Sequence, residues 1–294
     1  MIIVELLGGL GNQLFQYAAG RATALRLGTS LALDTRFLDQ DRKRAFALGA
    51  FRVRATTFNG WQRPPWRIDG EWWPWLRLVA AERLGQPLPM ARFKEDDSAG
   101  TFDGSSLQLR RSTVMSGYFQ SERYFAEFAT VLKHELTLAS SPSPSFQQAA
   151  IAISAAGPNS VSLHIRRGDY ATDPTTAAVH GLVGCDYYSR ALAALATQIV
   201  RPSIFLFTDD LRALAEIEAL DLRPHVLSGL GLTDAEEMML MAACRHHVIA
   251  NSSFSWWGAW LGQHGGTTVA PGRWFAKESA ASIKDRFPSA WLVV

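Results

Sequence analysis

Three apolar stretches in the second half of the sequence end in polar residues that could bind an anion or a nucleobase. Residues 161–165 lead into Arg166-Arg167-Gly168-Asp169, residues 203–207 into Thr208-Asp209-Asp210, and residues 247–250 into Asn251-Ser252-Ser253. Carboxyl ends of parallel strands meet at one edge of a sheet, so we expect these side chains to gather there. Two arginines beside a helix start rich in serine and backbone N–H donors would bind a pyrophosphate without a metal ion. A neighbouring carboxylate would accept the two adjacent N–H donors of guanine.

Each of these polar groups also has a purely structural interpretation. Asp209 or Asp210 could be the N-cap of a following helix, and Asn251 with the serines after it could cap the next one. The arginine pair could be a solvated surface pair. Residue types and spacing alone leave both interpretations open for each group.

The N-terminal glycines allow two functional interpretations. Residues 2–7 are predicted to form a strand, Gly8-Gly9-Leu10-Gly11-Asn12 a turn, and the residues from Asn12 onward a helix. The glycines, with Asp34 at the end of a second strand, partly match a dinucleotide fingerprint, although Leu14 occupies the third glycine position. This pattern would suit an NAD-type oxidoreductase. The same turn could instead bring backbone N–H groups and the Asn12 amide to a sugar or phosphate.

The order of predicted elements indicates an α/β protein with parallel sheets. Strands are predicted at residues 161–165, 203–207, 225–227, 247–250 and 267–270, with helices near residues 186–199, 211–220, 233–244 and 254–263. This alternation is typical of a doubly wound parallel sheet. The serine and proline run at residues 140–145 is predicted to be a linker, which divides the chain into domains 1–145 and 146–294. The first domain includes a tryptophan-rich segment, residues 58–78, that could contact an acceptor or only pack.

Composition excludes several classes of protein. The 294 residues include 29 Lys and Arg against 27 Asp and Glu, a net charge of +2, which makes nucleic acid a poor partner. Cys185 and Cys244 form no CxxC motif and have no histidine at ligand spacing, so neither a disulfide framework nor a metal site is predicted. No stretch resembles a signal peptide or a transmembrane segment. We expect a cytoplasmic protein, with peripheral contact to a membrane left open.

Six segments of the sequence resemble, in order and spacing, a known family. They are GGLGNQLFQYAAGR at 8–21, SGYFQSERYF at 116–125, HIRRGDY at 164–170, FTDD at 207–210, NSSFSWWGAWL at 251–261 and APGRWF at 270–275. Together they resemble the bacterial α-1,2-fucosyltransferases of glycosyltransferase family 11. The resemblance implies a GT-B fold, two Rossmann-like domains with parallel sheets facing across a cleft. It also implies metal-independent, inverting transfer of L-fucose from GDP-β-L-fucose to the 2-hydroxyl of a terminal β-galactoside. Such an acceptor would belong to a glycan such as an O-antigen or another surface polysaccharide. Lipid linkage of that glycan, and with it peripheral contact to the cytoplasmic face of the bacterial inner membrane, is left open.

The resemblance also assigns roles to individual residues. Arg166 would bind the GDP phosphates and act in catalysis, and His164 would lie close to the nucleotide. Asp209 would accept hydrogen bonds from guanine. In the second domain the pyrophosphate would bind at the helix start formed by Asn251, Ser252, Ser253 and Phe254. Gly11 and Asn12 would approach the donor from the first domain.

Two points remain open in the sequence. Asp169 is the nearest carboxylate in a motif and is our candidate general base, although it could instead hold Arg166 or Arg167 in place. Besides the oxidoreductase, the alternative is a non-catalytic module that binds a sugar nucleotide without transferring the sugar.

Overall fold

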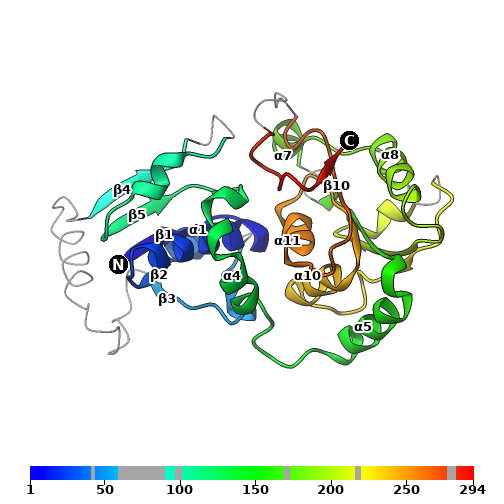
Figure 1. Ribbon diagram of the computed structural model, residues 1–294, viewed down its shortest axis with the longest axis horizontal. Helices are drawn as coiled ribbons and strands as arrows, with labels where there is room; N and C mark the ends of the chain where they lie inside the picture. Colours follow the sequence, from blue (N-terminus) through cyan, green and yellow to red (C-terminus); the bar gives the residue numbers. More distant parts are fainter. Residues whose placement is uncertain (41–43, 59–89, 97–100, 169–172, 216–219, 277–282) are drawn as a thin grey trace. The chain divides into compact units, whose positions relative to one another are not determined.

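The computed structural model describes residues 1–40, 44–58, 90–96, 101–168, 173–215, 220–276 and 283–294. These residues divide into two compact units, Met1–Thr137 and Leu138–Val294. Each unit contains one sheet in which every strand pair is parallel, accompanied by helices (Figure 1). The predicted α/β class, with the two Rossmann-like units that make up a GT-B chain, is confirmed. The predicted arrangement of the two sheets across a cleft stays a prediction.

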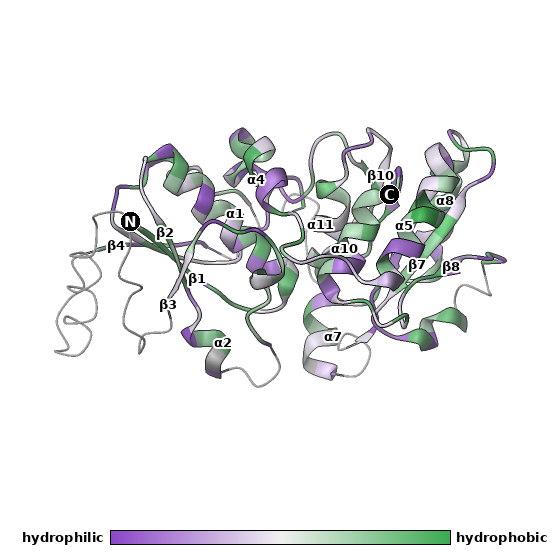
Figure 2. Ribbon diagram, turned by 90° about the horizontal axis from the view of Figure 1, so that it is seen from below, coloured by the Kyte–Doolittle hydropathy of each residue, from purple (hydrophilic) through white to green (hydrophobic). Residues whose placement is uncertain are grey.

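The first unit is built on a five-stranded sheet in the order β3-β2-β1-β5-β4. Its strands are β1 (Ile2–Glu5), β2 (Leu31–Asp34), β3 (Thr56–Phe58), β4 (Ala91–Lys94) and β5 (Thr113–Ser116). Its α-helices are α1 (Leu10–Arg26), α2 (Arg36–Gln40) and α4 (Ala129–Glu135), with short 3-10 turns at Leu48–Ala50, Gly104–Gln108, Glu122–Tyr124 and Ala126–Phe128. Figure 2 shows β1 and β2 in the green of hydrophobic residues, as expected for strands buried on both faces.

Helix α1 packs directly on β1 because Gly20 has no side chain. A Cβ on Gly20 would lie 2.3 Å from Cγ2 of Val4, too close for any larger residue. On α1, the Arg21 guanidinium also forms a salt bridge with Glu135 at 2.7 Å, and the Tyr17 hydroxyl donates to the same carboxylate. These contacts attach α4 to α1 and fix the helix that follows the glycine turn.

The second unit is built on a six-stranded sheet in the order β11-β10-β9-β6-β7-β8. Its strands are β6 (Ser160–Ile165), β7 (Ser203–Thr208), β8 (His225–Val226), β9 (His246–Val248), β10 (Thr268–Ala270) and β11 (Leu292–Val293). Its α-helices are α5 (Pro144–Ala156), α7 (Pro174–His180), α8 (Cys185–Ala196), α10 (Asp234–Ala243) and α11 (Ser253–Leu261). Short 3-10 turns lie at Gly157–Asn159 and Leu211–Ala213.

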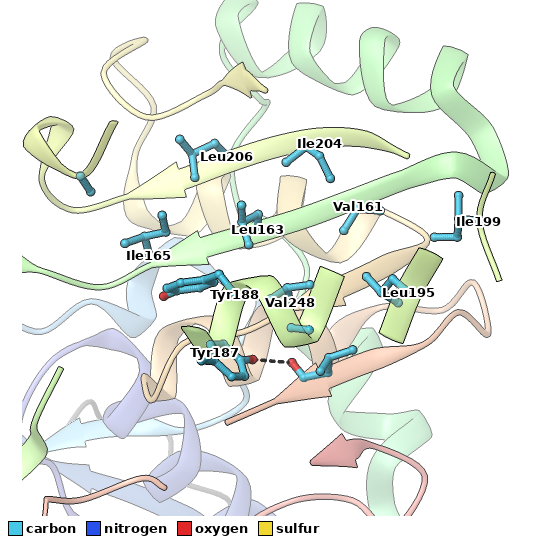
Figure 3. Close-up of a cluster of buried hydrophobic side chains, with 13 residues drawn as sticks. Val161, Leu163, Ile165, Tyr187, Tyr188, Leu195, Ile199, Ile204, Leu206 and Val248 are labelled. Atoms are coloured by element: carbon cyan, nitrogen blue, oxygen red, sulfur yellow. Dashed lines mark hydrogen bonds between the residues drawn. The ribbon is translucent and has the colours of Figure 1, made fainter. Parts of the chain in front are cut away.

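Alternation along β6 and β7 gives this sheet two apolar faces. Val161, Leu163, Ile165, Ile204 and Leu206 pack against α8, where the Tyr187 hydroxyl also donates to the Val269 carbonyl at 3.1 Å (Figure 3). The intervening residues Phe205 and Phe207 pack on the other face, against α5 and α10. A strand buried on both faces has nearly every residue apolar, which explains why the sequence of β7 reads as a continuous apolar run.

The strand order places a switch point at the central strand of each sheet. In the second unit the chain runs from β6 outward through β7 and β8, then returns to the other side of β6 and continues through β9, β10 and β11. This is the Rossmann order, in which ligands bind at the carboxyl ends of the strands beside the first strand. In the first unit β1 has β2 on one side and β5 on the other, so the corresponding point lies between β1 and β5.

The serine and proline segment is part of the second unit. The two compact units divide between Thr137 and Leu138, before residues 140–145. Ser143 caps α5 by accepting from the N–H of Phe146, and its own N–H donates to Oε1 of Glu236 at 2.7 Å. The same carboxylate completes the capping box of α10 with Thr233. Residues 143–145 of the predicted linker therefore form the anchored start of a helix, and residues 140–142 lie before it.

Several predicted boundaries differ from the structure. Helix α1 begins at Leu10, so Gly11 and Asn12 lie in its first turn and the glycine turn ends at Gly9. The helix predicted over 211–220 starts as a 3-10 turn at Leu211–Ala213, and residues 216–219 lie outside the described residues. Nearly all of the tryptophan-rich segment, residues 59–78, also lies outside them.

The Glu236 carboxylate is expected to stabilise the second unit in a pH-dependent way. N–H groups of Thr233 and Ser143 donate to it and lower the pKa of Glu236 to about 2. Replacing Glu236→Gln should therefore reduce the free energy of unfolding by about 1–2 kcal/mol at pH 7, because hydrogen bonds to a charged acceptor are lost. Since the folded-state pKa is depressed, this difference should shrink as the pH falls from about 4.5 towards 2.

Urea midpoints at pH 7 and pH 3 measure this effect. The matched control is Asp234→Asn, which removes one exposed carboxylate from the same helical turn. An equal loss in both variants, or a Glu236→Gln deficit that does not shrink at pH 3, would contradict the assignment.

Candidate functional site

The carboxylate of Asp209 connects the ends of β6 and β7. Its Oδ2 lies 3.0 Å from Nη1 of Arg166, and its Oδ1 accepts from the backbone N–H of Arg167 at 2.7 Å. The side chains of Arg166 and Asp209 are 20% and 24% exposed, so both reach solvent at the carboxyl edge of the sheet. The structure thus brings together the predicted phosphate-binding cation and the predicted guanine-binding carboxylate.

Gly168 makes room for this carboxylate. A Cβ on Gly168 would lie 2.1 Å from Oδ2 of Asp209 and 2.9 Å from its Cγ. Any side chain at this position would have to displace Asp209. The glycine after the two arginines is therefore required by the close approach of the neighbouring strand end.

The two arginines have different surroundings. Arg167 is buried, and its guanidinium donates to the carbonyls of Arg166 and Val183 at 2.7 and 3.0 Å. It therefore holds the loop after β6 to the segment before α8. Arg166 directs its guanidinium to Asp209 at the partly exposed edge, so the interpretation of a solvated surface pair is wrong.

Asp210, and not Asp209, is the helix cap. Its side chain accepts from the N–H of Arg212 at 3.0 Å and also pairs with that guanidinium at 2.6 Å. The Thr208 hydroxyl donates to the Asp210 carbonyl at 3.0 Å and tightens the turn. Asp210 therefore caps the turn that follows β7, and the Asp209 carboxylate contacts the loop after β6 instead.

His164 occupies the end of β6 as a buried neutral imidazole. Burial, and then the nearby charges of Arg166 and Arg167, lower its pKa to about 3. Its ring lies 5.8 Å from the ring of Phe254 at the start of α11, between centroids. Among the described residues, Nδ1 of His164 has no hydrogen-bond partner. At neutral pH this side chain can offer a ring N–H or a lone pair, but no positive charge.

The start of α11 combines a cap with partly exposed backbone. Ser252 is the N-cap, is buried, and accepts from the N–H of Phe254 at 3.3 Å. Ser253 and Phe254 are half-buried in the first turn. The capping interpretation is correct for Ser252, and the helix start it forms lies beside the switch point between β6 and β9.

Asn251 joins three segments of the second unit. Its Nδ2 lies within hydrogen-bond distance of the carbonyls of His180, Gly181 and Trp274, at 3.0, 3.3 and 3.2 Å. Asn251 is only 3% exposed. These contacts orient the loop before α11, and we keep a direct contact of Asn251 with a ligand as a prediction.

The sequence analysis did not predict a hydrogen-bonded pair, Ser228 and Glu237, that lies next to the end of β7. The Ser228 hydroxyl accepts from the N–H of Thr208 at 2.9 Å and donates to Oε2 of Glu237 at 3.2 Å. Burial raises the pKa of Glu237 to about 7, with Asp234 and Asp209 adding smaller repulsive contributions. No motif indicates this pair, because it depends on the turn between β8 and α10.

The carboxyl edge of the first unit carries Asn12 and the glycine turn. Gly8 has φ of +74°, and Gly11 is buried in the first turn of α1. The Asn12 Oδ1 accepts from Nε2 of Gln120 at 2.8 Å. Asp34, the residue expected to bind a ribose in a dinucleotide site, is 1% exposed and pairs with Arg36 at 2.6 Å. A dinucleotide would have to displace Arg36 to reach it.

Asp169, the candidate base, lies outside the described residues. Among the residues that are described, no group of three or more His, Cys, Asp or Glu side chains could hold a metal ion. Within the same residues, no helix is long and apolar enough to cross a membrane.

The two Rossmann-like units define the fold class of the protein, that of the GT-B glycosyltransferases. The chain belongs to glycosyl transferase family 11, whose profile matches residues 98–294. This membership makes the oxidoreductase interpretation of the N-terminal glycines wrong.

Two relatives from Escherichia coli match nearly the whole chain. An alpha-1,2-colitosyltransferase is 31% identical over 99% of this chain and 98% of its own length. The O-antigen biosynthesis glycosyltransferase WbnK is 30% identical over 95% of this chain and 96% of its own length.

Solved structures with a similar fold are more distant in sequence. A NodZ alpha-1,6-fucosyltransferase soaked with GDP-fucose matches with a TM-score of 0.48 and 16% identity, over 88% of this chain and 92% of that one. POFUT1 in complex with GDP-fucose matches with a TM-score of 0.45 and 14% identity, over 91% and 96%.

Replacing Gly168→Ala should disturb the site without unfolding the chain. The new Cβ would push the Asp209 carboxylate away from Arg166 and from the Arg167 N–H. We expect the affinity for GDP, the nucleotide predicted from the sequence, to fall by about 10-fold or more, because a charged hydrogen-bonded pair is lost. Calorimetric titration with GDP measures it.

The control for this variant is Gly184→Ala. A Cβ on Gly184 meets nothing within 4 Å, and this glycine also lies in the second unit, just before α8. Equal GDP affinities in the two variants would show that the space beside Asp209 does not matter for binding.

Proposed function

We propose that this family 11 glycosyltransferase moves L-fucose from GDP-β-L-fucose to the 2-hydroxyl of a terminal galactose, with inversion, in a surface glycan such as an O-antigen. The observation that carries the proposal is the Arg166–Asp209 pair, which joins the ends of β6 and β7 at the carboxyl edge of the second sheet, next to the switch point. It places a cation suited to phosphate and a carboxylate suited to guanine 3.0 Å apart. The names of the two E. coli relatives support α-1,2 linkage and an O-antigen acceptor.

Arg166 would stabilise the departing GDP. An inverting transfer passes through a single oxocarbenium-like state, in which negative charge grows on the β-phosphate while the acceptor oxygen enters from the opposite side. Fixed donors that meet this charge lower the barrier. Arg166 is held in position by Asp209, and the first turn of α11 offers backbone N–H groups at its half-buried start.

Asp209 can keep its structural contacts while it binds guanine. Each carboxylate oxygen accepts more than one hydrogen bond, so Oδ1 can hold the Arg167 N–H and still accept from a base. Oδ2 can likewise keep its contact with Arg166 and accept from the second guanine donor. His164, neutral and next to Phe254, would contact the nucleotide through its ring without adding charge.

The acceptor hydroxyl requires a proton acceptor, for which we propose Asp169. Asn12 in the first unit would contact the donor, and the metal-independence of the reaction is part of the same proposal. A second candidate function is colitosyl transfer, favoured by the 31% identity to the colitosyltransferase. A module that binds a sugar nucleotide without transfer is the remaining alternative.

The direct test is GDP release from GDP-fucose and from GDP-colitose over a panel of β-galactosides, in the presence of EDTA, with linkage analysis of the product. We expect turnover with a galactoside and a 1,2-linked product. GDP-fucose binding without GDP release would support the non-catalytic alternative, and a preference for GDP-colitose would support the second candidate.

Two variants separate the proposed roles in this assay. Arg166→Lys should lower transfer by about 100-fold or more, because the planar bidentate geometry is lost although the charge remains. Asp169→Asn should lose transfer while slow hydrolysis of GDP-fucose continues. Near-normal kcat/KM in Arg166→Lys would remove this residue from the phosphate site, and equal loss of donor binding in Asp169→Asn would remove Asp169 as the base.

A further inference from the structure

The loop that follows β5 meets the glycine turn at the switch point of the first unit. β1 pairs with β5 in parallel register, from Ile2 opposite Thr113 to Val4 opposite Met115. The segments that leave these two strands, residues 6–9 and residues 117–120, therefore leave the same edge side by side. Crevices at such edges are where ligands bind in open α/β sheets.

Two glutamines join these segments. Gln16 on α1 is fully buried, accepts from the N–H of Leu7 at 3.0 Å and donates to the Gly117 carbonyl at 3.2 Å. Gln120 donates from Nε2 to Oδ1 of Asn12 at 2.8 Å. Because the Asn12 oxygen accepts from Gln120, the Asn12 amide nitrogen, which lies beside Gly8, can donate to a ligand.

A buried carboxylate fixes the shape of the loop. Glu95, just after β4, is 7% exposed, and its Oε2 accepts from the N–H groups of Tyr118 and Phe119 at 2.8 and 2.6 Å. Its Oε1 accepts from the Tyr124 hydroxyl at 2.7 Å. A Cβ on Gly117 would lie 2.5 Å from Cβ of Glu95, so this approach requires a glycine.

The loop turns Phe119 inward and leaves Tyr118 at the surface. Phe119 has φ of +52°, a left-handed backbone conformation that a phenylalanine rarely adopts, and its ring is fully buried beside Phe93 and Tyr124. Tyr118, one position earlier, is 39% exposed. Strain of this kind persists only where the surroundings enforce it, and it clusters at ligand sites.

We propose that Tyr118, with the Asn12–Gln120 amide pair, forms a sugar-binding surface, and that Glu95 and Gln120 are its positioning residues. An aromatic ring offers an apolar face with a hydroxyl at its end, and a carboxamide offers a donor and an acceptor. Together these groups match a hexopyranose, which has an apolar C–H face and a rim of hydroxyls. The inference rests on the proposed function, in which donor and acceptor each carry such a ring.

The test uses the full chain and measures initial rates while GDP-fucose and lactose are varied in turn. The variants are Tyr118→Ala and Gln120→Met, which remove the ring and the amide contact from the surface of the loop. Val131→Ala is the control, because Val131 on α4 is equally exposed, at 39%, in the same unit. Thermal melting of each variant checks that the fold is intact.

We expect both variants to raise KM for the same substrate by about fivefold or more, with kcat and the melting temperature close to those of the control. A higher KM for lactose identifies the bound ring as that of the acceptor, and a higher KM for GDP-fucose identifies it as that of the donor. Both outcomes support the surface. KM values for both substrates that match those of Val131→Ala would overturn it.

Glu95→Gln tests positioning separately. It should raise KM for the same substrate as the two surface variants and leave KM for the other substrate unchanged, a split that general loss of stability would not produce. If Glu95→Gln lowers kcat/KM for both substrates by the same factor, Glu95 has only a structural role. If the wild-type chain releases no GDP with any galactoside, the proposed function itself is wrong. That outcome is distinct from failure of the sugar-binding surface, which shows as unchanged KM values in variants of an active enzyme.

Discussion

The short contact between the ends of β6 and β7, made by the Asp209 carboxylate, is the constraint on which the candidate site depends. One oxygen accepts from the Arg167 N–H and the other pairs with the Arg166 guanidinium. Gly168 is needed because the carboxylate occupies the space of a side chain. The parallel register of β6 and β7, which pairs Ile165 with Thr208, places these groups side by side at the ends of the two strands. The apolar core thus sets the geometry of a polar edge.

Both units use the same arrangement at their switch points. In each, buried polar side chains bind backbone groups of the loops at the carboxyl edge of the sheet and leave partly exposed side chains there. In the second unit Asn251 and Ser252 fix the start of α11. In the first unit Gln16 and Glu95 fix the glycine turn and the loop after β5. Buried polar groups of this kind are stable only when their hydrogen bonds are made, so they specify one loop conformation.

Much of this arrangement follows from the sequence, and the reasons for the exceptions are physical. The apolar stretches at residues 161–165 and 203–207 predicted β6 and β7, and with them the meeting of Arg166 and Asp209, because parallel strands end at one edge. Which of Asp209 and Asp210 caps the next turn could not be predicted, since both have the right spacing. The anchoring of Ser143 by Glu236, and of Tyr118 and Phe119 by Glu95, joins residues far apart in the chain. Short strands such as β3 and the mostly exposed β4 carry too little pattern to be recognised.

Hydrogen exchange of the backbone amides with and without GDP, in EDTA, tests whether the nucleotide binds at Arg166 and Asp209. We predict that GDP slows exchange at residues 165–168 and 252–255, at the carboxyl edge of the second sheet. Amides at the opposite edge, around Ser160 and Arg245, should be unaffected. Protection at that opposite edge, or GDP binding that leaves residues 165–168 unprotected, would contradict the placement of the nucleotide at Arg166 and Asp209.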